Sequence, residues 1–252
     1  MALTLWITRS QPGAQRLADA LADSGLNLKV APVQEIIPTD TWQQLARAEQ
    51  QPPALVLVTS QHAATAYVSS MLATRALAVV HVAVGDATAA ILRDYGFEVV
   101  VPAEHASEGM LGLPQLKALP RTSVVWLIAG EGGRNLLQSE LAKQGVRALK
   151  FEFYRRAPVT PAALKELPEL VEIASLEGLR LVMETLRLTE QDSMPQSSPA
   201  LPFMVVASPR IAEAARGHGV PQIECARGPE VAVMKEAVFR AVSKISQGKQ
   251  DG

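Results

Sequence analysis

Several short aliphatic runs of this sequence are followed at once by glycine, serine or threonine, and then by an amphipathic segment. The residues at these positions are Thr8, Ser60, Gly85, Thr88, Gly130, Ser175 and Ser208, and the arginines Arg9, Arg134 and Arg155 follow three of the runs. If the runs are strands and the segments helices, these residues lie at helix starts, where N–H groups lack intrahelical partners and the dipole is positive. Helix starts bind anions, and hydroxyl and guanidinium groups add donors. The pattern therefore predicts a site that recognises negative charge.

The serines and threonines at these positions have a second interpretation. They are preferred N-cap residues of any helix, so capping alone explains each one taken singly. Six such helix starts are present, however, and they occur in both halves of the chain. This repetition favours a ligand site built mainly from backbone N–H groups.

Familiar catalytic and cofactor motifs are missing from the sequence. The glycine-rich run Gly130–Arg134 has the wrong spacing for a dinucleotide fingerprint, and neither a phosphate-binding P-loop nor a G-x-S-x-G motif occurs. The histidines are remote from one another in sequence and lack metal-ligand spacing, so we interpret them as structural; they are His62, His81, His105 and His218. Cys225 is the single cysteine, which excludes a disulfide framework and favours a packing role. We therefore expect neither a metal nor a cofactor.

The elements that position the small residues follow an alternating order. Strands are predicted at Leu3–Thr8, Leu28–Ile37, Leu55–Thr59, Val79–Val84, Glu98–Val101, Val124–Ile128 and Ala148–Tyr154. Helices are predicted at Gly13–Ser24, from Ser60 to near Leu72, at Asp86–Tyr95 and at Asn135–Gln144. Alternation of this kind predicts an α/β protein with parallel sheets and right-handed crossovers. In such sheets a ligand binds at the carboxyl ends of the strands, where the small residues lie.

Two pairs of segments are similar to each other and predict an internal duplication. The stretch VAVGDATAAILRDYGF aligns with VVASPRIAEAARGHGV, which matches Gly85 with Ser208. The stretch TSQHAATAYV aligns with ASLEGLRLVM, which matches Ser60 with Ser175. Similar separations within the two pairs favour two related lobes, whose helix starts we expect to face a shared gap. The alternative is that any two strand–helix units look alike.

Composition limits the class of protein. The 252 residues are 48% hydrophobic and only 4% aromatic, so we expect aliphatic cores of the kind found in covered parallel sheets. The formal net charge is −1 and no basic run occurs, which argues against nucleic acid as a partner. No signal peptide and no apolar run long enough for a membrane span is visible, so a cytoplasmic protein is expected. Arg155–Ala163 is predicted to be a linker and Asp192–Pro202 a mobile surface loop.

An ordered series of segments resembles the uroporphyrinogen-III synthase family. The series is LWITRSQPGAQRLADALADSG, LVLVTSQHAATA, VAVGDATAAILRDYGFEVVVP, GEGGRNLLQSELAKQGV and FEFYRRAP. The likeness runs from Leu3 to about Val242, and no single motif within it is diagnostic. Ala129 stands where the family often has arginine, and Ile211 stands where many members have threonine. A hydroxyl at position 211 is therefore not indispensable in this chain.

The resemblance implies a fold and an activity. The fold would be two similar α/β lobes, each a parallel sheet flanked by helices, joined by two extended segments. One lobe would comprise residues 1–37 with 157–252, and the other residues 38–156. The activity would convert the anionic linear tetrapyrrole hydroxymethylbilane into uroporphyrinogen III, with loss of water and inversion of the last pyrrole ring. The resemblance further implies no cofactor, and hand-over of the substrate from hydroxymethylbilane synthase. We expect a monomer, because no exposed apolar heptad or repeat suggests assembly.

The resemblance also implies roles for individual residues. Tyr154, in FEFYRR, matches the tyrosine that has been proposed in the family as a general acid; the alternative is a tyrosine that packs at the junction of the lobes. The residues that we predict to bind substrate are Thr8, Arg9, Ser60, Gly85, Thr88, Gly130, Arg134, Ser175 and Ser208. There are two rival functions. One is a non-enzymatic, two-lobed binding protein for an anionic metabolite, which would have the same fold and crevice. The other is a nucleotide-utilising α/β enzyme, which the missing phosphate loops disfavour.

Overall fold

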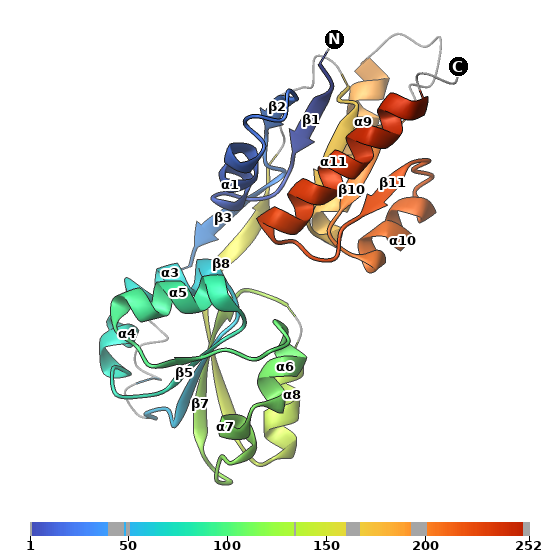
Figure 1. The fold of residues 1–252 in the computed structure, drawn as a ribbon. Coiled ribbons are helices and arrows are strands. Elements are labelled where there is room, and N and C mark those ends of the chain that lie inside the picture. The colour runs from blue at the N-terminus through green and yellow to red at the C-terminus, as the bar shows by residue number, and fades with distance from the viewer. Residues whose placement is uncertain are drawn as a thin grey trace. The chain divides into compact units, whose positions relative to one another are not determined.

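The computed structural model describes residues 2–39, 48, 51–133, 135–159, 167–192 and 201–248 (Figure 1). The chain divides into two compact units, one formed by Met1–Glu35 with Ala157–Gly252 and the other by Ile36–Arg156. The divisions fall within strand β3 (Gln34–Pro38) and strand β8 (Arg147–Pro158). The resemblance had predicted divisions after residues 37 and 156. Each unit is described by itself below.

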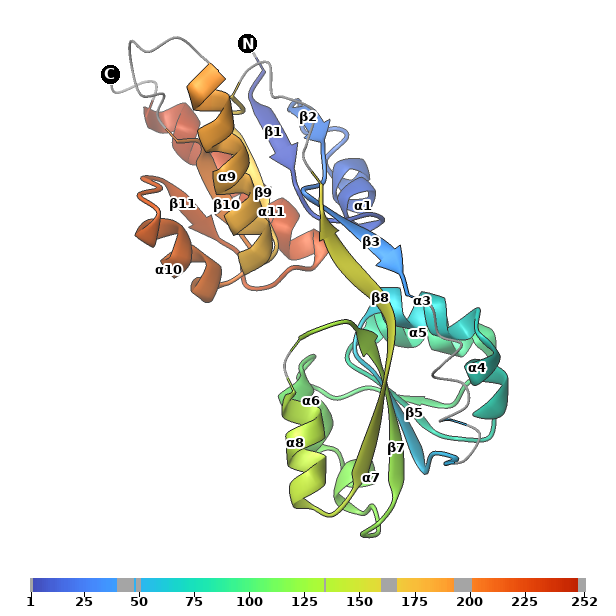
Figure 2. The ribbon, with the colours of Figure 1, turned by 180° about the vertical axis from the view of Figure 1, so that it is seen from behind.

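The first unit is a five-stranded parallel sheet in the order β11-β10-β9-β1-β2. Its strands are β1 (Thr4–Ile7), β2 (Asn27–Val30), β9 (Leu170–Ile173), β10 (Phe203–Val206) and β11 (Ile223–Cys225). Its helices are α1 (Gly13–Ala20), α9 (Leu176–Asp192), α10 (Pro209–Gly217) and α11 (Val231–Gly248). Two opposite views of the ribbon place α9 and α10 on one face of this sheet and α1 and α11 on the other (Figures 1 and 2). Helices on both faces explain why the central strands are continuous apolar runs.

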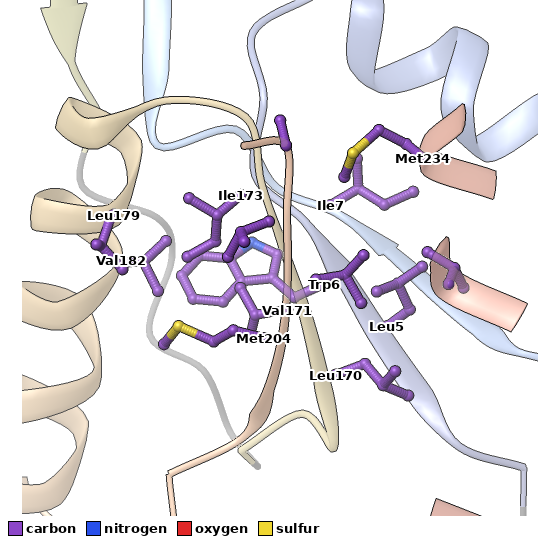
Figure 3. Packing of buried hydrophobic residues seen from close by; sticks show 14 of the residues in the cluster. Leu5, Trp6, Ile7, Leu170, Val171, Ile173, Leu179, Val182, Met204 and Met234 are labelled. Carbon is purple, nitrogen blue, oxygen red and sulfur yellow. The ribbon is translucent and has the colours of Figure 1, made fainter. Parts of the chain in front are cut away.

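The core of the first unit shows how one strand serves both faces. Successive side chains of a strand point to opposite sides, and Leu5, Trp6 and Ile7 are all fully buried. The Trp6 ring lies on the side of Val182 in α9, whereas Ile7 lies on the side of Met234 in α11 (Figure 3). The indole N–H of Trp6 donates to the carbonyl oxygen of Ala31 at 2.7 Å, so its polar atom is satisfied.

The second unit is a six-stranded sheet in the order β3-β8-β7-β4-β5-β6. Its other strands are β4 (Leu55–Val58), β5 (His81–Ala83), β6 (Val99–Val100) and β7 (Val124–Gly130), and the pairings of β4 with β5 and β7, of β5 with β6, and of β7 with β8 are parallel. Its helices are α3 (Gln61–Val68), α4 (Met71–Arg75), α5 (Asp86–Tyr95), α6 (Ser107–Gly112), α7 (Pro114–Lys117) and α8 (Leu136–Lys143). Val56 and Val58 pack with residues of α3, α4 and α5, whereas Leu55 and Leu57 pack with residues of α6, α7 and α8.

The two sheets have the same strand order once corresponding strands are matched. The series β2-β1-β9-β10-β11 corresponds to β8-β7-β4-β5-β6. Ser175 and Ser60 then follow equivalent strands, and so do Ser208 and Gly85, as the sequence alignment predicted. In each sheet the strand order reverses at one point, between β1 and β9 or between β7 and β4. Ligands of open α/β sheets bind at such switch points, at the carboxyl ends of the strands.

Two elements that were predicted as single are divided in the structure. The single strand expected at Leu28–Ile37 is divided into β2 and β3. The cause is a change of partner, because β2 pairs with β1 in one sheet and β3 with β8 in the other. The helix expected from Ser60 to near Leu72 is also divided, into α3 and α4. The Ser70 hydroxyl donates to the Tyr67 carbonyl at 2.6 Å at that break, a side-chain bond that competes with a continuing helix.

The predicted linker and loop lie partly outside the described residues. Arg155–Pro158 belong to β8, so this part of the predicted linker is a strand, whereas residues 160–166 are not described. Asp192 is the last residue of α9, and residues 193–200 of the predicted surface loop are not described either. No helix within the described ranges is both long and apolar enough to cross a membrane.

Candidate functional site

Tyr154 owes its position to a bulge in β8. Ala129 of β7 is paired with Glu152, but the next residue, Gly130, is paired with Tyr154. Phe153 is therefore the extra residue, and both it and Tyr154 are buried, at 3% and 4% exposed. A regular strand would have turned two neighbouring side chains to opposite faces. The bulge thus redirects Tyr154, as bulges commonly do beside active sites.

The Tyr154 ring lies directly over Gly130. A Cβ atom on Gly130 would stand 2.5 Å from Cζ of the ring, a distance that no side chain tolerates. Because position 130 carries only hydrogen, the ring can cross over the end of β7. Its hydroxyl then lies 3.1 Å from Oγ of Ser60, which follows β4 on the other side of β7. The three residues Ser60, Gly130 and Tyr154 therefore meet at the switch point of the second sheet.

Ser60 is fixed by the helix that it begins. It has an extended backbone at the N-cap of α3, and its Oγ accepts the N–H of Ala63 at 3.1 Å. The same oxygen contacts the Tyr154 hydroxyl. Oγ of Ser60 therefore serves both as the helix cap and as a contact of the site. The capping bond holds Oγ in place, and Oγ in turn contacts the phenol.

Two further side chains complete this group. Nη2 of Arg156 donates to the Tyr154 hydroxyl at 3.2 Å, and its Cζ lies 5.3 Å from the ring centroid. The His62 ring meets the Tyr154 ring edge-on, with centroids 5.5 Å apart. We call Ser60, His62, Gly130, Tyr154 and Arg156 the Tyr154 cluster. Chemically it offers one phenolic proton beside a permanent cation, which is an arrangement suited to proton donation.

The loop that follows β7 is tied to β8 next to this cluster. The N–H of Glu131 donates to the carbonyl oxygen of Tyr154 at 2.7 Å, and Nζ of Lys150 donates to the carbonyl oxygen of Gly132 at 2.8 Å. Gly132 has a φ of +72°, in the left-handed region that favours glycine. Arg134 lies outside the described residues, so its predicted contact with substrate stays a prediction.

The start of α5 provides the next helix terminus along this edge. Gly85 is its N-cap, and a Cβ there would come within 3.2 Å of the His105 ring. Nε2 of His105 lies 3.6 Å from a carboxylate oxygen of Asp86. Thr88, in the first turn of α5, is only 3% exposed. Gly85 is thus at the helix start as predicted, whereas Thr88 is enclosed within the unit.

The corresponding edge of the first unit holds an ion pair. Glu172, in β9, has a fully buried side chain, and its Oε1 accepts bonds from Nε and Nη2 of Arg9 at 2.8 and 2.6 Å. Nη1 of Arg9 donates to the carbonyl oxygen of Pro229 at 2.8 Å. The hydroxyl of Thr8 donates to the carbonyl oxygen of Glu172 at 2.5 Å. The structure thus brings Thr8 and Arg9 together around a carboxylate of the chain itself.

The two remaining predicted residues of the first unit are helix starts. Oγ of Ser175 accepts the N–H of Gly178 at 3.0 Å, which is a capping contact ahead of α9. Ser208 is the N-cap of α10, and its side chain makes no capping bond. Both lie after strands that neighbour each other in the sheet, β9 and β10.

Three residues at these edges were not predicted as site residues: His62, Arg156 and Glu172. Arg156 could have been found, because residues two apart on a strand share a face and Arg156 follows Tyr154 by two. Glu172 carried a weaker signal, a single carboxylate within the apolar run LVEI. His62 carried none beyond its place two residues after Ser60.

Comparison with known proteins gives one family and several solved structures. The model of the HEM4 family, described as uroporphyrinogen-III synthase HemD, matches residues 15–235. A mutant uroporphyrinogen III synthase from the extremely thermophilic bacterium Thermus thermophilus is 17% identical, with a TM-score of 0.60 over 96% of this chain and 100% of that one. Uroporphyrinogen-III synthetase from Helicobacter pylori 26695 is 14% identical, with a TM-score of 0.62 over 95% of this chain and 99% of that one. At these identities the two structures establish a likeness of fold.

Proposed function

The chain belongs to the uroporphyrinogen-III synthase family, and from that premise we propose that it converts hydroxymethylbilane into uroporphyrinogen III. The reaction removes one water molecule, closes the tetrapyrrole ring and inverts the last pyrrole. The enzyme is accordingly a cyclising lyase. The observation that carries this proposal is the family match over residues 15–235 of the 252.

The substrate carries acetate and propionate side chains on every ring, so it is strongly anionic. We propose that its carboxylates are bound by helix starts and by neighbouring side chains. The proposed residues are Ser60, Gly85, Gly130, Arg134, Ser175 and Ser208. Three other residues predicted from the sequence are engaged within the first or second unit: the Thr8 hydroxyl and the Arg9 guanidinium are bound to Glu172, and Thr88 is 3% exposed. The near-zero net charge of the chain does not oppose this, because N–H groups at helix starts act locally.

The substrate is reactive without an enzyme. Its hydroxyl group leaves as the electron-rich pyrrole pushes electrons towards the hydroxymethyl carbon, and the product is an azafulvene. An unguided azafulvene closes to the symmetrical type I isomer. The work of the enzyme is therefore to fold the bilane so that the substituted carbon of the last ring attacks. Orientation of this kind contributes about 7–11 kcal/mol in favourable cases.

Tyr154 is the proposed general acid for the loss of water. Its O–H bond breaks, the proton passes to the hydroxyl oxygen of the substrate, and the C–O bond breaks with its electron pair remaining on the departing water. The pyrrole N–H later loses its own proton, so that the azafulvene is neutral. A well-placed general acid contributes roughly 10²- to 10⁴-fold. Support comes from the fixed position of the phenol between Ser60 and Arg156.

The type of isomer formed tests the proposal. Hydroxymethylbilane is generated in the same vessel by hydroxymethylbilane synthase, the products are oxidised to porphyrins, and the type I and type III isomers are separated by chromatography. We expect the type III isomer to predominate when the chain is present. Formation of type I alone, at the rate seen without the chain, would instead indicate a binding protein for an anionic metabolite.

We further propose that the enzyme is a cytoplasmic monomer that receives its substrate directly from hydroxymethylbilane synthase. Hydroxymethylbilane cyclises by itself to the wrong isomer, so direct transfer between the two enzymes would shorten the time available for that side reaction. Light scattering coupled to size-exclusion chromatography measures the mass of the particle. A mass of about 27 kDa agrees with a monomer, and twice that mass contradicts it.

A further inference from the structure

We propose that Arg156 is a positioning residue for the proton donor, which fixes the Tyr154 hydroxyl and stabilises the negative charge that this oxygen gains when it gives up its proton. The inference rests on the proposed function and extends it to a residue that neither the capping pattern nor the helix starts point to. Arg156 and Tyr154 lie two residues apart on β8, so their side chains share a face.

The hydrogen-bond capacity of the phenol shows what Arg156 does there. A phenolic oxygen has one proton and two lone pairs, and a guanidinium group can only donate. Nη2 of Arg156, at 3.2 Å, therefore occupies a lone pair of the Tyr154 oxygen and leaves the proton available. Ser60 contacts the same oxygen at 3.1 Å and can act as donor or acceptor. Of the two partners, Arg156 is thus the one that can only donate to this oxygen.

The charge of Arg156 matters at the moment of proton transfer. Before transfer the phenol is neutral, so the bond from the charged guanidinium of Arg156 is assisted by one charge only. After transfer the oxygen is an anion, and the same bond joins two opposite charges, so that a Coulombic attraction is added to it. An interaction that is stronger in the transition state than in the ground state lowers the barrier. Because the guanidinium already touches the oxygen, no group has to move for this gain.

A purely structural role explains Arg156 less well. Its side chain belongs to an exposed residue, and exposed cations contribute little to stability. Among the described residues, the Tyr154 hydroxyl is the only group that accepts a hydrogen bond from it. The guanidinium also lies against the Tyr154 ring, with Cζ 5.3 Å from the centroid. Its hydrogen bond to a described residue and its contact with an aromatic ring are therefore both made with the proposed proton donor.

The test compares Arg156→Gln with a matched control, Arg147→Gln, which removes the same charge from an exposed residue at the other end of β8. Each substitution is made in the natural sequence and in the Tyr154→Phe background, and type III formation is followed under steady-state conditions. Loss of one bond to a developing charge predicts a fall in kcat of about tenfold for Arg156→Gln, with KM changed less than about twofold. Arg156→Lys retains a charged donor and should recover part of the loss.

The measurements in the Tyr154→Phe background distinguish a positioning role of Arg156 from a structural one. If Arg156 acts through the phenolic oxygen, Arg156→Gln should cost nothing further once Tyr154→Phe has removed that oxygen. An equal fall in kcat in both backgrounds, an effect on KM alone, or a loss no larger than that of Arg147→Gln would overturn the proposal. Equal melting temperatures of the variants ensure that folding is not the cause.

A spectroscopic measurement separates this inference from the proposed function. Tyrosine labelled with ¹³C at Cζ gives one signal for each of the three tyrosines, and Tyr154→Phe identifies that of residue 154. Arg156→Gln should shift that signal, and Arg147→Gln should leave it in place. An unshifted signal would refute the positioning contact whether or not the chain is active. Absence of type III product with the natural sequence would refute the proposed function alone.

Discussion

Gly130→Ala provides the sharpest test of the Tyr154 cluster, because it adds a single carbon atom under the tyrosine ring. The new Cβ would lie 2.5, 2.7 and 2.9 Å from Cζ, Cε2 and Cε1 of Tyr154. Non-bonded carbon atoms prefer about 3.5–4.0 Å, so the ring has to move by about 1 Å. The backbone of Gly130 does not lie in the left-handed region, so alanine adds no backbone strain there.

That displacement determines both the expected loss in the free energy of unfolding and the expected fall in kcat. Overpacking of a buried site costs about 1–3 kcal/mol in the free energy of unfolding. A displacement of about 1 Å at a catalytic group can lower the rate by about 10²-fold, because the hydroxyl leaves Ser60 and Arg156. We therefore expect moderate destabilisation together with a large fall in kcat for type III formation.

The assay combines urea unfolding with chromatography of the porphyrin isomers. Gly112→Ala is the matched control, since a Cβ at Gly112 meets no atom within 4 Å and its φ is ordinary. A second variant, Gly130→Ala with Tyr154→Leu, removes the clashing ring and should recover stability without recovering kcat. If Gly130→Ala behaved like Gly112→Ala in both measurements, the ring could not lie where the structure places it.

Three further predictions concern single side chains. Tyr154→Phe should lower kcat by about 10²-fold without changing the melting temperature; stopped-flow kinetics that match the natural sequence would remove the acid role. Burial lowers the pKa of His81 to about 4, so the unfolded chain binds the proton more readily than the folded chain does. The free energy of unfolding should therefore fall by about 3 kcal/mol as the pH drops from about 6.5 to about 4. Urea unfolding across that range measures this slope, which His81→Phe should abolish. Arg9→Ala should cost about 3–5 kcal/mol, because it leaves the buried carboxylate of Glu172 unpaired, and calorimetry should register that loss more strongly than KM does.

The local sequence pattern was sufficient to predict those elements whose structure depends on their own residues and near neighbours. Asp86–Tyr95 is helical as predicted, because Gly85 precedes it, Gly96 ends it at a φ of +104°, and its apolar positions recur at helical spacing. The strand that precedes Ser60 is likewise visible as an unbroken aliphatic run. Such features depend on residues within a few positions of one another.

The contacts of the site could not be predicted in the same way. Ser60, Gly130 and Tyr154 were each singled out, but their meeting depends on β7 lying between β4 and β8 and on a bulge at Phe153. Neither the strand order nor the bulge leaves a mark in the local sequence. Arg9 looked like a free donor for the same reason, since its partner Glu172 lies 163 positions away.

The two units differ at the switch points of their sheets. At the switch point of the first unit, Arg9 lies against the buried carboxylate of Glu172, so its positive charge is already neutralised. At the switch point of the second unit, the phenol of Tyr154 bridges the end of β7 and keeps an exposed cation, Arg156, on its oxygen. A neutralised ion pair has little free energy left to offer a reacting group, whereas a phenol beside an exposed cation can donate a proton and stabilise the charge that remains. The acid role that we propose is therefore suited to the phenol of Tyr154 in the second unit, and Arg9 in the first unit is not suited to it.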